Sequence, residues 1–559
     1  MNSRTLRNDN IEIIFGKDPL DIVKIIDRKS NEIICKSARQ RFLWRIPEEV
    51  SDPVLLSSAK WTGFDDNSFR FSCTDRNENY RVDIDMVLTE SGVHFQADWQ
   101  APQPIWLVEW KIDHLQLNDI FIPALGGQHL RSNMPVGTEL SYKYPFWWNA
   151  QFAIGESKNN KGMCLYSNDS RPNLKLLRVG KESSGFTLSY GYEAPAPLDS
   201  KQVKCDWYLK TYQNGWKNVV EEYREWMEPN FDLEPLKNKS DNPKWLNDIN
   251  FILEVWGANR RSEEPFHTFQ EIEQRLKDWE KIHSPDETLL YLPGFAENGI
   301  DSHAPDYNPS PQMGGSEGFH KMMHTAHKLG YKVMIHTNVL AMAFSHPAFK
   351  DFKKYQVEDP FGRPVSWGLD MDGDWITEPY FAYINPGQDK WSKLMADTLG
   401  ELVTKYNIDG IFLDQTLLAF NVSNGPNFID GMRSHVKKLQ RNFPDILFAG
   451  EGLHECITQP FSLAQIHGID SISNVHGMEG KQPWRDVHPI STYLFNRYTR
   501  FMAHLLTKHP SSQEFKRQES AYEKLEVIPA LCLYNSCQEM DLPQTRAMVE
   551  RAKTIKSWR

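Results

Sequence analysis

The sequence predicts a multidomain protein in which an N-terminal antiparallel β-sandwich precedes a (β/α)8-type TIM barrel. The chain has 559 residues, which is too long for one ordinary domain. Apolar and polar residues alternate through much of the first 228 residues, as in half-buried antiparallel strands. Later in the chain, short apolar runs alternate with helical patterns, which indicates a parallel sheet. We therefore assign residues 1–228 to the sandwich, 229–245 to a linker and 246–559 to the barrel.

Two neighbouring runs show the period-two pattern of the sandwich most clearly, and the turn at residues 89–92 joins them. Their apolar members are Tyr80, Val82, Ile84, Met86, Val93, Phe95, Ala97 and Trp99. One helix closes the region, because the apolar residues between Trp216 and Met227 fall on a single helical face. The polar, proline-rich residues that follow are typical of a linker.

Seven apolar runs are expected to form the parallel strands of the barrel. In chain order they lie at residues 250–256, 288–293, 332–338, 411–413, 446–450, 469–474 and 527–533. Helical patterns separate most of them; the clearest has Ser316 as its cap and Gly330 as its stop. No glycine-rich phosphate loop follows any of these runs, which counts against a nucleotide-binding sheet.

A barrel of this type needs eight strands, and the count of apolar runs is one short. After the seventh run comes a helical pattern at residues 545–556, and then only Ser557-Trp-Arg559. Three residues are too few for an ordinary strand. We therefore expect a barrel without its eighth strand in a C-terminally truncated chain. The alternative is an overlooked strand within residues 375–384.

Two of the expected strands end in a carboxylate. Asp414 follows the run Ile411-Phe-Leu413, and Glu451 closes Ile446-Leu-Phe-Ala-Gly450. The carboxyl ends of barrel strands are where active sites are built, so we expect both side chains to face one cleft. A single such residue could equally cap a helix or pair with an arginine. Two on successive strands match the carboxylate pair that cleaves glycosidic bonds.

Composition limits the partners that this protein can be expected to bind. The net charge of −11 argues against nucleic acid, and no apolar run approaches a membrane span. Aromatic residues make up 12% of the chain, which mildly favours stacking on sugar rings. The N-terminal apolar run is too short for a signal peptide, and the seven scattered cysteines suit a reducing compartment. We expect a cytoplasmic protein with a carbohydrate substrate; the sequence leaves the oligomeric state open.

These motifs resemble those of a group of glycoside hydrolases. The resemblance rests on Tyr291-Leu-Pro293, His336-Thr-Asn338, Asp409-Gly-Ile-Phe-Leu-Asp-Gln415 and Ala449-Gly-Glu-Gly452 at strands two to five. It is nearest to endo-α-N-acetylgalactosaminidases and uncharacterised bacterial relatives, and more distant to the α-amylase clan. The resemblance implies a retaining α-glycosidase with Asp414 as nucleophile and Glu451 as acid/base.

The chain departs from the α-amylase pattern at two places. That pattern has arginine two residues before the nucleophile, where this chain has Phe412. It also has a His-Asp pair after strand seven, where this chain reads Tyr534-Asn535. A starch-type substrate is therefore not expected.

Polar and aromatic residues at the strand ends and in the following loops are the candidate substrate-binding groups. They are Glu254, Trp256, Tyr291, Asp306, His336, Asn338, Trp367, Gln415, His454, Asn474 and Asn535. Each alone has a structural role as its simpler explanation. Asp370, Asp372 and Asp374 have the alternate spacing of a calcium loop, but Phe381 stands where the closing glutamate belongs. We expect no metal and no cofactor.

Two other functions stay open from the sequence. The α-galactosidase clan also has a strand-four Asp nucleophile, but its acid/base is an Asp at strand six, where Asp470 is the candidate. Asp470 precedes most of the run at 469–474, so this alternative ranks second. The other is a non-catalytic carbohydrate-binding protein derived from a hydrolase; the intact Asp414/Glu451 pair weighs against it.

Overall fold

The computed structural model forms two compact units. It describes residues 3–47, 52–157, 159–240, 242–260, 264–370, 372, 374–469, 472, 482–504, 513–534 and 538–555. Unit 1 comprises Met1–Phe231 with Lys481–Leu494, and unit 2 comprises Asp232–Gly480 with Phe495–Arg559. A short segment from the C-terminal part of the chain therefore belongs to the N-terminal unit.

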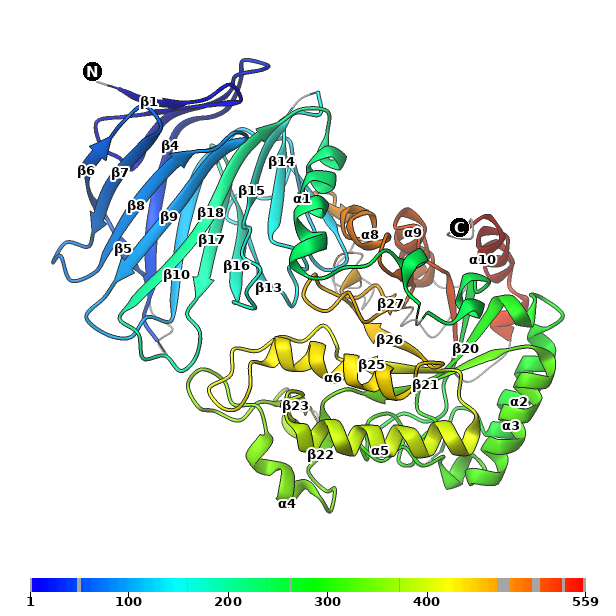
Figure 1. Cartoon of the computed structure of the whole chain (residues 1–559). Helices are drawn as coiled ribbons and strands as arrows, with labels where there is room; N and C mark the ends of the chain where they lie inside the picture. Colours follow the sequence, from blue (N-terminus) through cyan, green and yellow to red (C-terminus); the bar gives the residue numbers. More distant parts are fainter. Residues whose placement is uncertain are drawn as a thin grey trace. The chain divides into compact units, whose positions relative to one another are not determined.

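Unit 1 contains two antiparallel sheets (Figure 1). Among the described residues the first has nine strands: β1 (Arg4–Arg7), β2 (Ile11–Phe15), β3 (Asp21–Asp27), β4 (Glu32–Arg45), β5 (Val54–Leu56), β10 (Leu107–Leu115), β13 (Glu139–Tyr144), β16 (Lys175–Glu182) and β17 (Gly185–Glu193). The described part of the second has ten: β6 (Ser58–Phe64), β7 (Ser68–Thr74), β8 (Arg81–Leu88), β9 (Gly92–Gln100), β11 (Asp119–Ile122), β12 (Gln128–Arg131), β14 (Phe152–Glu156), β15 (Gly162–Tyr166), β18 (Gln202–Tyr212) and β28 (Arg485–Val487).

The inner faces of the two sheets meet in an aromatic core. Trp110 on β10 and Trp207 on β18 have ring centroids 5.3 Å apart, and Phe95 on β9 stacks on Trp207 at 5.4 Å. All three side chains are buried. They sit at the inward positions of alternating strands, which confirms the predicted antiparallel region at the N-terminus. Helix α1 (Trp216–Asn230) follows β18 and buries Val219, Val220, Tyr223 and Met227.

Strand β28 completes the second sheet of unit 1 from far along the sequence. Leu130 of β12 is paired with Arg485, and Gln128 with Val487, in antiparallel register. Arg131 also donates to the carbonyl of Pro483 at 3.2 Å. The sequence contains no sign of this pairing, because Arg485-Asp-Val487 is too short to show a strand pattern.

Unit 2 is built around a parallel sheet with eight strands in the described part of the chain (Figure 1). In spatial order they are β29 (Arg500–Met502), β27 (Leu463–Gln465), β26 (Leu447–Glu451), β25 (Gly410–Asp414), β21 (Lys332–Asn338), β20 (Thr288–Leu292), β19 (Phe251–Val255) and β30 (Ala530–Leu533). A parallel bridge between Met502 and Ile528 links the two ends, so the barrel is nearly closed.

The predicted loss of the eighth strand is wrong. Two short strands supply what the apolar runs did not show: β27 is the sixth strand and β29 the seventh, so β30 is the eighth. The predicted sixth strand at 469–474 is also wrong, because strand six ends at Gln465 and Ile469 is helical. Residues 470, 471, 473 and 474 lie outside the described residues. The alternative run at 375–384 forms β24 (Glu378–Tyr383), which pairs antiparallel with β22 (Ala341–Ala343) and β23 (Ser366–Leu369).

Helices connect the barrel strands. The described ones are α2 (Phe269–Trp279), α3 (Gly315–Leu329), α4 (Phe349–Phe352), α5 (Asp389–Tyr406), α6 (Phe428–Asn442), α9 (Gln513–Lys524) and α10 (Pro543–Thr554), while α8 (Ile490–Phe495) begins in unit 1. The N-terminus of α2 is closed by a capping box between Thr268 and Glu271. The predicted linker contains two 3-10 turns, at Leu236–Asn238 and Lys244–Asn247.

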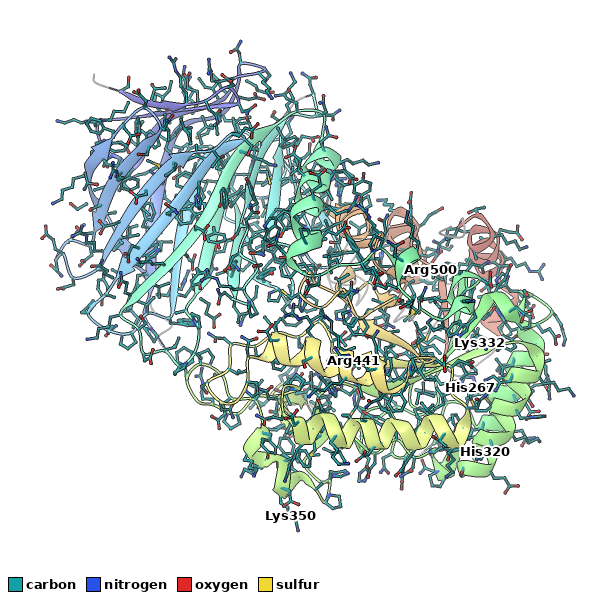
Figure 2. The ribbon with its side chains drawn as sticks, in the orientation of Figure 1. His267, His320, Lys332, Lys350, Arg441 and Arg500 are labelled. Carbon is teal, nitrogen blue, oxygen red and sulfur yellow. The ribbon has the colours of Figure 1, made fainter. Side chains whose placement is uncertain are left out.

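Asp409 ties two neighbouring strands together at their amino ends. Its carboxylate accepts from Lys332 at 2.9 Å, from the backbone N–H of Val333 at 3.0 Å, and lies 2.8 Å from His327 Nε2 (Lys332 is labelled in Figure 2). These contacts lower the pKa of Asp409 although burial opposes them. The cluster fixes the register of β21 on β25. It therefore also fixes which residues lie opposite each other at the carboxyl ends of the two strands.

The six described cysteines are buried, and no disulfide joins any two of them. Within the described chain, no helix combines the length and the hydrophobicity that crossing a membrane requires.

Candidate active site

Four adjacent barrel strands place polar residues at one level of the barrel. Asn338 of β21 pairs in register with Asp414 of β25, and Glu451 of β26 pairs with Gln465 of β27. Leu413 lies opposite Gly450, so the next residues, Asp414 and Glu451, are level as well. Side chains at one level of neighbouring parallel strands point to the same face. The two predicted catalytic carboxylates therefore lie side by side at the carboxyl ends of β25 and β26.

Asp414 is held by an amide and lies close to a buried ion pair. Asn338 donates from Nδ2 to Asp414 Oδ2 at 3.2 Å. The side-chain oxygen of Asn338 is fixed in turn by the backbone N–H groups of Leu340 and Ala341. Ligating atoms of Asp301, His336 and Asp414 lie within 4.8 Å of one another. The carboxylate is thus oriented by one neighbour and sits in the field of two others.

Glu451 receives a backbone hydrogen bond from the strand beside it. The N–H of Gln415 donates to Glu451 Oε2 at 2.9 Å. The other oxygen, Oε1, is 3.6 Å from His467 Nδ1. Thr416 donates from its hydroxyl to the carbonyl of Glu451 at 3.3 Å. These contacts fix the backbone and one carboxylate oxygen of Glu451 against the end of β25.

A buried network lies next to Asp414. His336 Nε2 is 3.2 Å from Asp301 Oδ1, and its Nδ1 is 2.7 Å from the hydroxyl of Tyr291. Arg260 donates to the other oxygen of Asp301 at 3.4 Å. Its guanidinium also stacks over the ring of Trp367, at 4.5 Å from the centroid. This network brings two cationic side chains close to the candidate catalytic carboxylates.

Burial and the neighbouring charges make Asp414 hard to ionise. Burial raises the pKa of Asp414 well above its ordinary value, and the charges of Glu451 and Asp301 raise it further. His336 and Arg260 oppose that rise. For His336, burial lowers the pKa, but Asp301 outweighs it and the net pKa is raised. The neighbouring cations therefore do not fully balance the negative charges of these carboxylates. A transition state that carries positive charge would be stabilised by them.

We expect His336→Gln to shift the acid limb of the activity profile to higher pH. The charge of His336 favours ionised Asp414, so its loss raises the pKa of Asp414 and keeps the nucleophile protonated over more of the acid range. The measurement is kcat/KM of the free enzyme between about pH 4 and pH 8. His320→Gln on α3 is the matched control, because that residue contacts Tyr406 on the outer helices. An unshifted acid limb in the His336 variant would contradict this role.

Several predicted binding residues lie inside the barrel, below the catalytic level. Glu254 is 1% exposed, and Trp256 donates to its carboxylate at 2.7 Å. Tyr291 is buried and bonded to His336. Trp256 itself is half-buried and stacks on Tyr534 with centroids 5.1 Å apart. The buried side chains support the site from below.

Glu254→Gln is expected to stabilise the protein near neutral pH. Burial raises the pKa of Glu254 from 4.5 to about 7, although Trp256 and Cys532 lower it. Because the pKa of Glu254 is higher in the folded than in the unfolded protein, its contribution to the free energy of unfolding is fully present below pH 4.5. That contribution is lost as the pH rises toward about 7. The variant avoids this loss, and its advantage should grow to about 3 kcal/mol at pH 7 and then stay constant. Urea unfolding as a function of pH tests this, and parallel curves for both proteins would contradict it.

Other predicted residues are placed away from Asp414 and Glu451 or are engaged elsewhere. Asp306 pairs with His346 at 3.0 Å and lies 3.7 Å from His303. Trp367 stacks on Phe381 at 5.2 Å. His454 is fully buried, and burial lowers its pKa to about 3. Asn474 and Asn535 lie outside the described residues.

The three aspartates of the calcium-like loop are exposed. They accept backbone N–H groups of their own loop: Asp370 from Trp375 at 3.1 Å, Asp372 from Asp374 at 3.1 Å, and Asp374 from Ile376 at 2.8 Å. The indole of Trp375, 89% exposed, projects from this loop. The aspartates have a structural role in shaping the turn.

Sequence reasoning missed residues that come from loops. Asp301 and Arg260 lie in connections after β20 and β19, and Tyr383 comes from β24 outside the barrel. Gln465, 1% exposed, ends a strand that was not predicted. No periodicity marks such positions. Only their residue type could have identified Asp301 and Arg260 from the sequence, because each is a charged residue in a loop that follows a barrel strand.

A family model described as "Domain of unknown function (DUF6259)" matches residues 202–461. The match includes strands β19 to β26, with Asp414 and Glu451, and ends before β27. No protein with a curated description matches the sequence.

Solved structures with the same arrangement are glycosidases. The α-N-acetylgalactosaminidase NagBb from Bifidobacterium bifidum, in complex with GalNAc, aligns with a TM-score of 0.74 at 11% identity, over 99% of this chain and 92% of that chain. The galactosidase domain of the α-galactosidase-sucrose kinase AgaSK aligns with a TM-score of 0.52 at 10% identity, over 99% and 85%. The GH36 α-galactosidase AgaA from Geobacillus stearothermophilus aligns with a TM-score of 0.50 at 10% identity, over 99% and 86%.

The chain has the fold of these glycosidases. At such identities the likeness establishes the fold alone, an antiparallel β region followed along the chain by a parallel barrel. It extends over nearly the whole chain, whereas the sequence resemblance covered mainly the barrel.

Proposed function

We propose that this protein is a retaining glycoside hydrolase that cleaves α-glycosidic bonds, with Asp414 as nucleophile and Glu451 as acid/base. The observation that carries the proposal is the placement of both carboxylates at one level of adjacent strands, at the carboxyl end of the barrel. The glycosidase fold of the aligned structures supports the same reaction class.

The mechanism follows from the charges of the site. Asp414 attacks the anomeric carbon while Glu451 gives its proton to the leaving oxygen, and Glu451 then takes a proton from the attacking water. The sugar passes through a transition state with oxocarbenium character, and its positive charge develops beside Asp414, whose ionised form is disfavoured by burial and by the charge of Asp301. The positive charge of the transition state therefore offsets part of the cost of ionising Asp414.

A terminal α-linked galactose or N-acetylgalactosamine is the substrate that we favour. NagBb was solved with GalNAc and with Gal-NHAc-DNJ, and the other aligned enzymes are α-galactosidases. In this chain Phe412 stands where starch-acting enzymes have an arginine, and its ring lies 5.5 Å from that of His336. The β25 strand thus presents an aromatic ring below Asp414.

A related enzyme with another acid/base remains the second candidate. The reason for ranking Asp470 low was its position within strand six, but strand six is β27 and ends at Gln465. Asp470 therefore follows the strand in sequence, as an acid/base at strand six would. Its own placement lies outside the described residues. Glu451 stays our first choice because its register with Asp414 is observed.

A panel of p-nitrophenyl α-glycosides tests the proposal, with the β-anomers as stereochemical controls. We expect hydrolysis of the α-galactoside or the α-N-acetylgalactosaminide by the wild-type protein, with retention of configuration in the product. Tight binding of these sugars without turnover would instead support the non-catalytic alternative. Inversion of configuration would contradict the nucleophile role of Asp414.

A further inference from the structure

Gln415 has a backbone conformation that its residue type disfavours. It directly follows Asp414 and has a φ of 65°, in the left-handed region. Apart from glycine, which has no Cβ, only asparagine and aspartate adopt this region readily, because Cβ otherwise approaches a backbone oxygen. Such conformations persist where the surroundings enforce them, and they concentrate at functional sites.

The left-handed turn redirects one N–H group. The ladder between β25 and β26 ends at the pair Leu413 and Gly450. At Gln415 the N–H points instead to the side chain of Glu451 and donates to Oε2 at 2.9 Å. With the chain held on both sides, an extended φ at Gln415 would require the peptide plane between Asp414 and Gln415 to rotate, and its N–H would then turn away from Glu451. The conformation therefore delivers a hydrogen-bond donor to one oxygen of the candidate acid/base.

The amide side chain of Gln415 holds the turn in place. Its Oε1 accepts from Asn338 Nδ2 at 3.2 Å, and its Nε2 donates to the hydroxyl of Tyr383 at 3.3 Å. Asn338 is the same residue that holds Asp414. Both ends of the amide are thus engaged with protein groups. This arrangement favours a role in positioning over the sugar contact that the sequence suggested for Gln415.

We propose that Gln415 is a positioning residue whose backbone N–H determines which oxygen of Glu451 carries the catalytic proton. This inference rests on the proposed function. A neutral carboxyl group has one O–H and one carbonyl oxygen, and the carbonyl oxygen is the better acceptor for an N–H donor. Because Oε2 faces the N–H, the proton lies on Oε1. Oε1 is also the oxygen on the side of His467.

The two chemical steps then proceed through Oε1. In the first, Asp414 forms a bond to the anomeric carbon, the glycosidic C–O bond breaks, and the proton of Oε1 moves to the leaving oxygen. In the second, water attacks the anomeric carbon, the bond to Asp414 breaks, and a water proton returns to Oε1. Throughout both steps Oε2 keeps its hydrogen bond to Gln415, so the carboxyl group does not rotate.

The variants Gln415→Gly and Gln415→Ala separate backbone from side chain. Both lack the amide, but only glycine adopts the left-handed conformation without strain. We expect Gln415→Gly to retain more kcat/KM for glycosides with poor leaving groups than Gln415→Ala, because glycine keeps the left-handed backbone although the amide is lost in both. Gln415→Ala should lose about 10- to 100-fold, because acid catalysis is worth roughly 10²- to 10⁴-fold and is only partly lost. Equal losses in the two variants would overturn the proposal.

A second readout needs no turnover. Carbodiimide labels protonated carboxyl groups, and peptide mapping reports the labelling of Glu451 as a function of pH. Loss of the N–H donor disfavours the ionised form, so the midpoint of labelling should rise in Gln415→Ala and stay in place in Gln415→Gly. An unchanged midpoint in Gln415→Ala would overturn the proposal even if the wild-type protein proved inactive, whereas inactivity itself would refute only the proposed function. If Gln415→Ala does not fold, Gln415→Asn and Gln415→Ser provide the same comparison.

Discussion

Replacing Asp414 by asparagine is expected to lower kcat for every cleaved glycoside by at least about 10⁴-fold. The amide keeps the shape of the carboxylate and can still contact Asn338, but it cannot form the glycosyl ester. Purified Asp414→Asn and wild-type protein, assayed on the same p-nitrophenyl glycoside, give the comparison. Activity within tenfold of wild type would place the nucleophile elsewhere.

The same variant should unfold at a higher temperature than the wild-type protein at neutral pH. A carboxyl group whose folded pKa is raised loses stability as it ionises, and this cost lies above its ordinary pKa. Asparagine carries no charge and avoids that cost. A variant that is both inactive and more stable would show that Asp414 serves the reaction and lowers the stability of the folded protein. An inactive and destabilised variant would indicate misfolding instead.

Replacing Glu451 by glutamine is expected to slow poor leaving groups by about 10²- to 10⁴-fold and to spare activated ones. A nitrophenolate departs with little protonation, whereas a sugar hydroxyl needs the acid. The measurement is kcat/KM across a series of aryl glycosides with leaving groups of increasing pKa. The slope of the logarithmic plot should steepen in Glu451→Gln.

Asp470→Asn is the matched variant that tests the second candidate. It removes a carboxylate that follows strand six in sequence, by the same change of one atom. With Glu451 as acid/base, the leaving-group slope of Asp470→Asn stays that of the wild-type protein. A steep slope for Asp470→Asn together with a normal slope for Glu451→Gln would transfer the acid/base role to Asp470.

The sequence predicted those strands whose apolar runs are continuous. The strand before Asp414 was expected at 411–413 and is observed at Gly410–Asp414. The strand before Glu451 is likewise confirmed. Such runs are buried on both faces of a parallel sheet and therefore carry a clear signal.

The sequence did not predict two of the strands. They are stabilised by tertiary contacts, and their residues do not form an apolar run. β27 has three residues and ends in the polar Gln465. β29 begins with Arg500, a charged residue that is 3% exposed. Burial lowers the pKa of Arg500 to about 10, and the guanidinium donates to the carbonyl of Leu246. A pattern read from hydrophobicity cannot identify a buried arginine whose hydrogen-bond partners come together only after folding.

The residues of the candidate site also fall into those that the sequence predicts and those that it does not. Strand-end residues such as Asn338 and Gln415 could be predicted, since alternation and register determine where they lie. The contacts among those residues could not be predicted: the sequence suggested Gln415 as a sugar ligand, and gave no sign that its backbone N–H donates to Glu451. Asp301 and Arg260 come from connections whose paths no periodicity determines. Their pairing next to His336 became visible only in three dimensions.

The pairing of β12 with β28 has a consequence for how the chain is made. The sandwich leaves the ribosome before the barrel, yet its last strand is synthesised roughly 250 residues after Phe231. At roughly 5–20 residues per second, β12 waits tens of seconds as an unpaired edge, long enough to meet other nascent chains. During that interval the completion of the N-terminal sheet depends on successful synthesis of most of the barrel. Vectorial folding of this protein therefore cannot proceed one domain at a time.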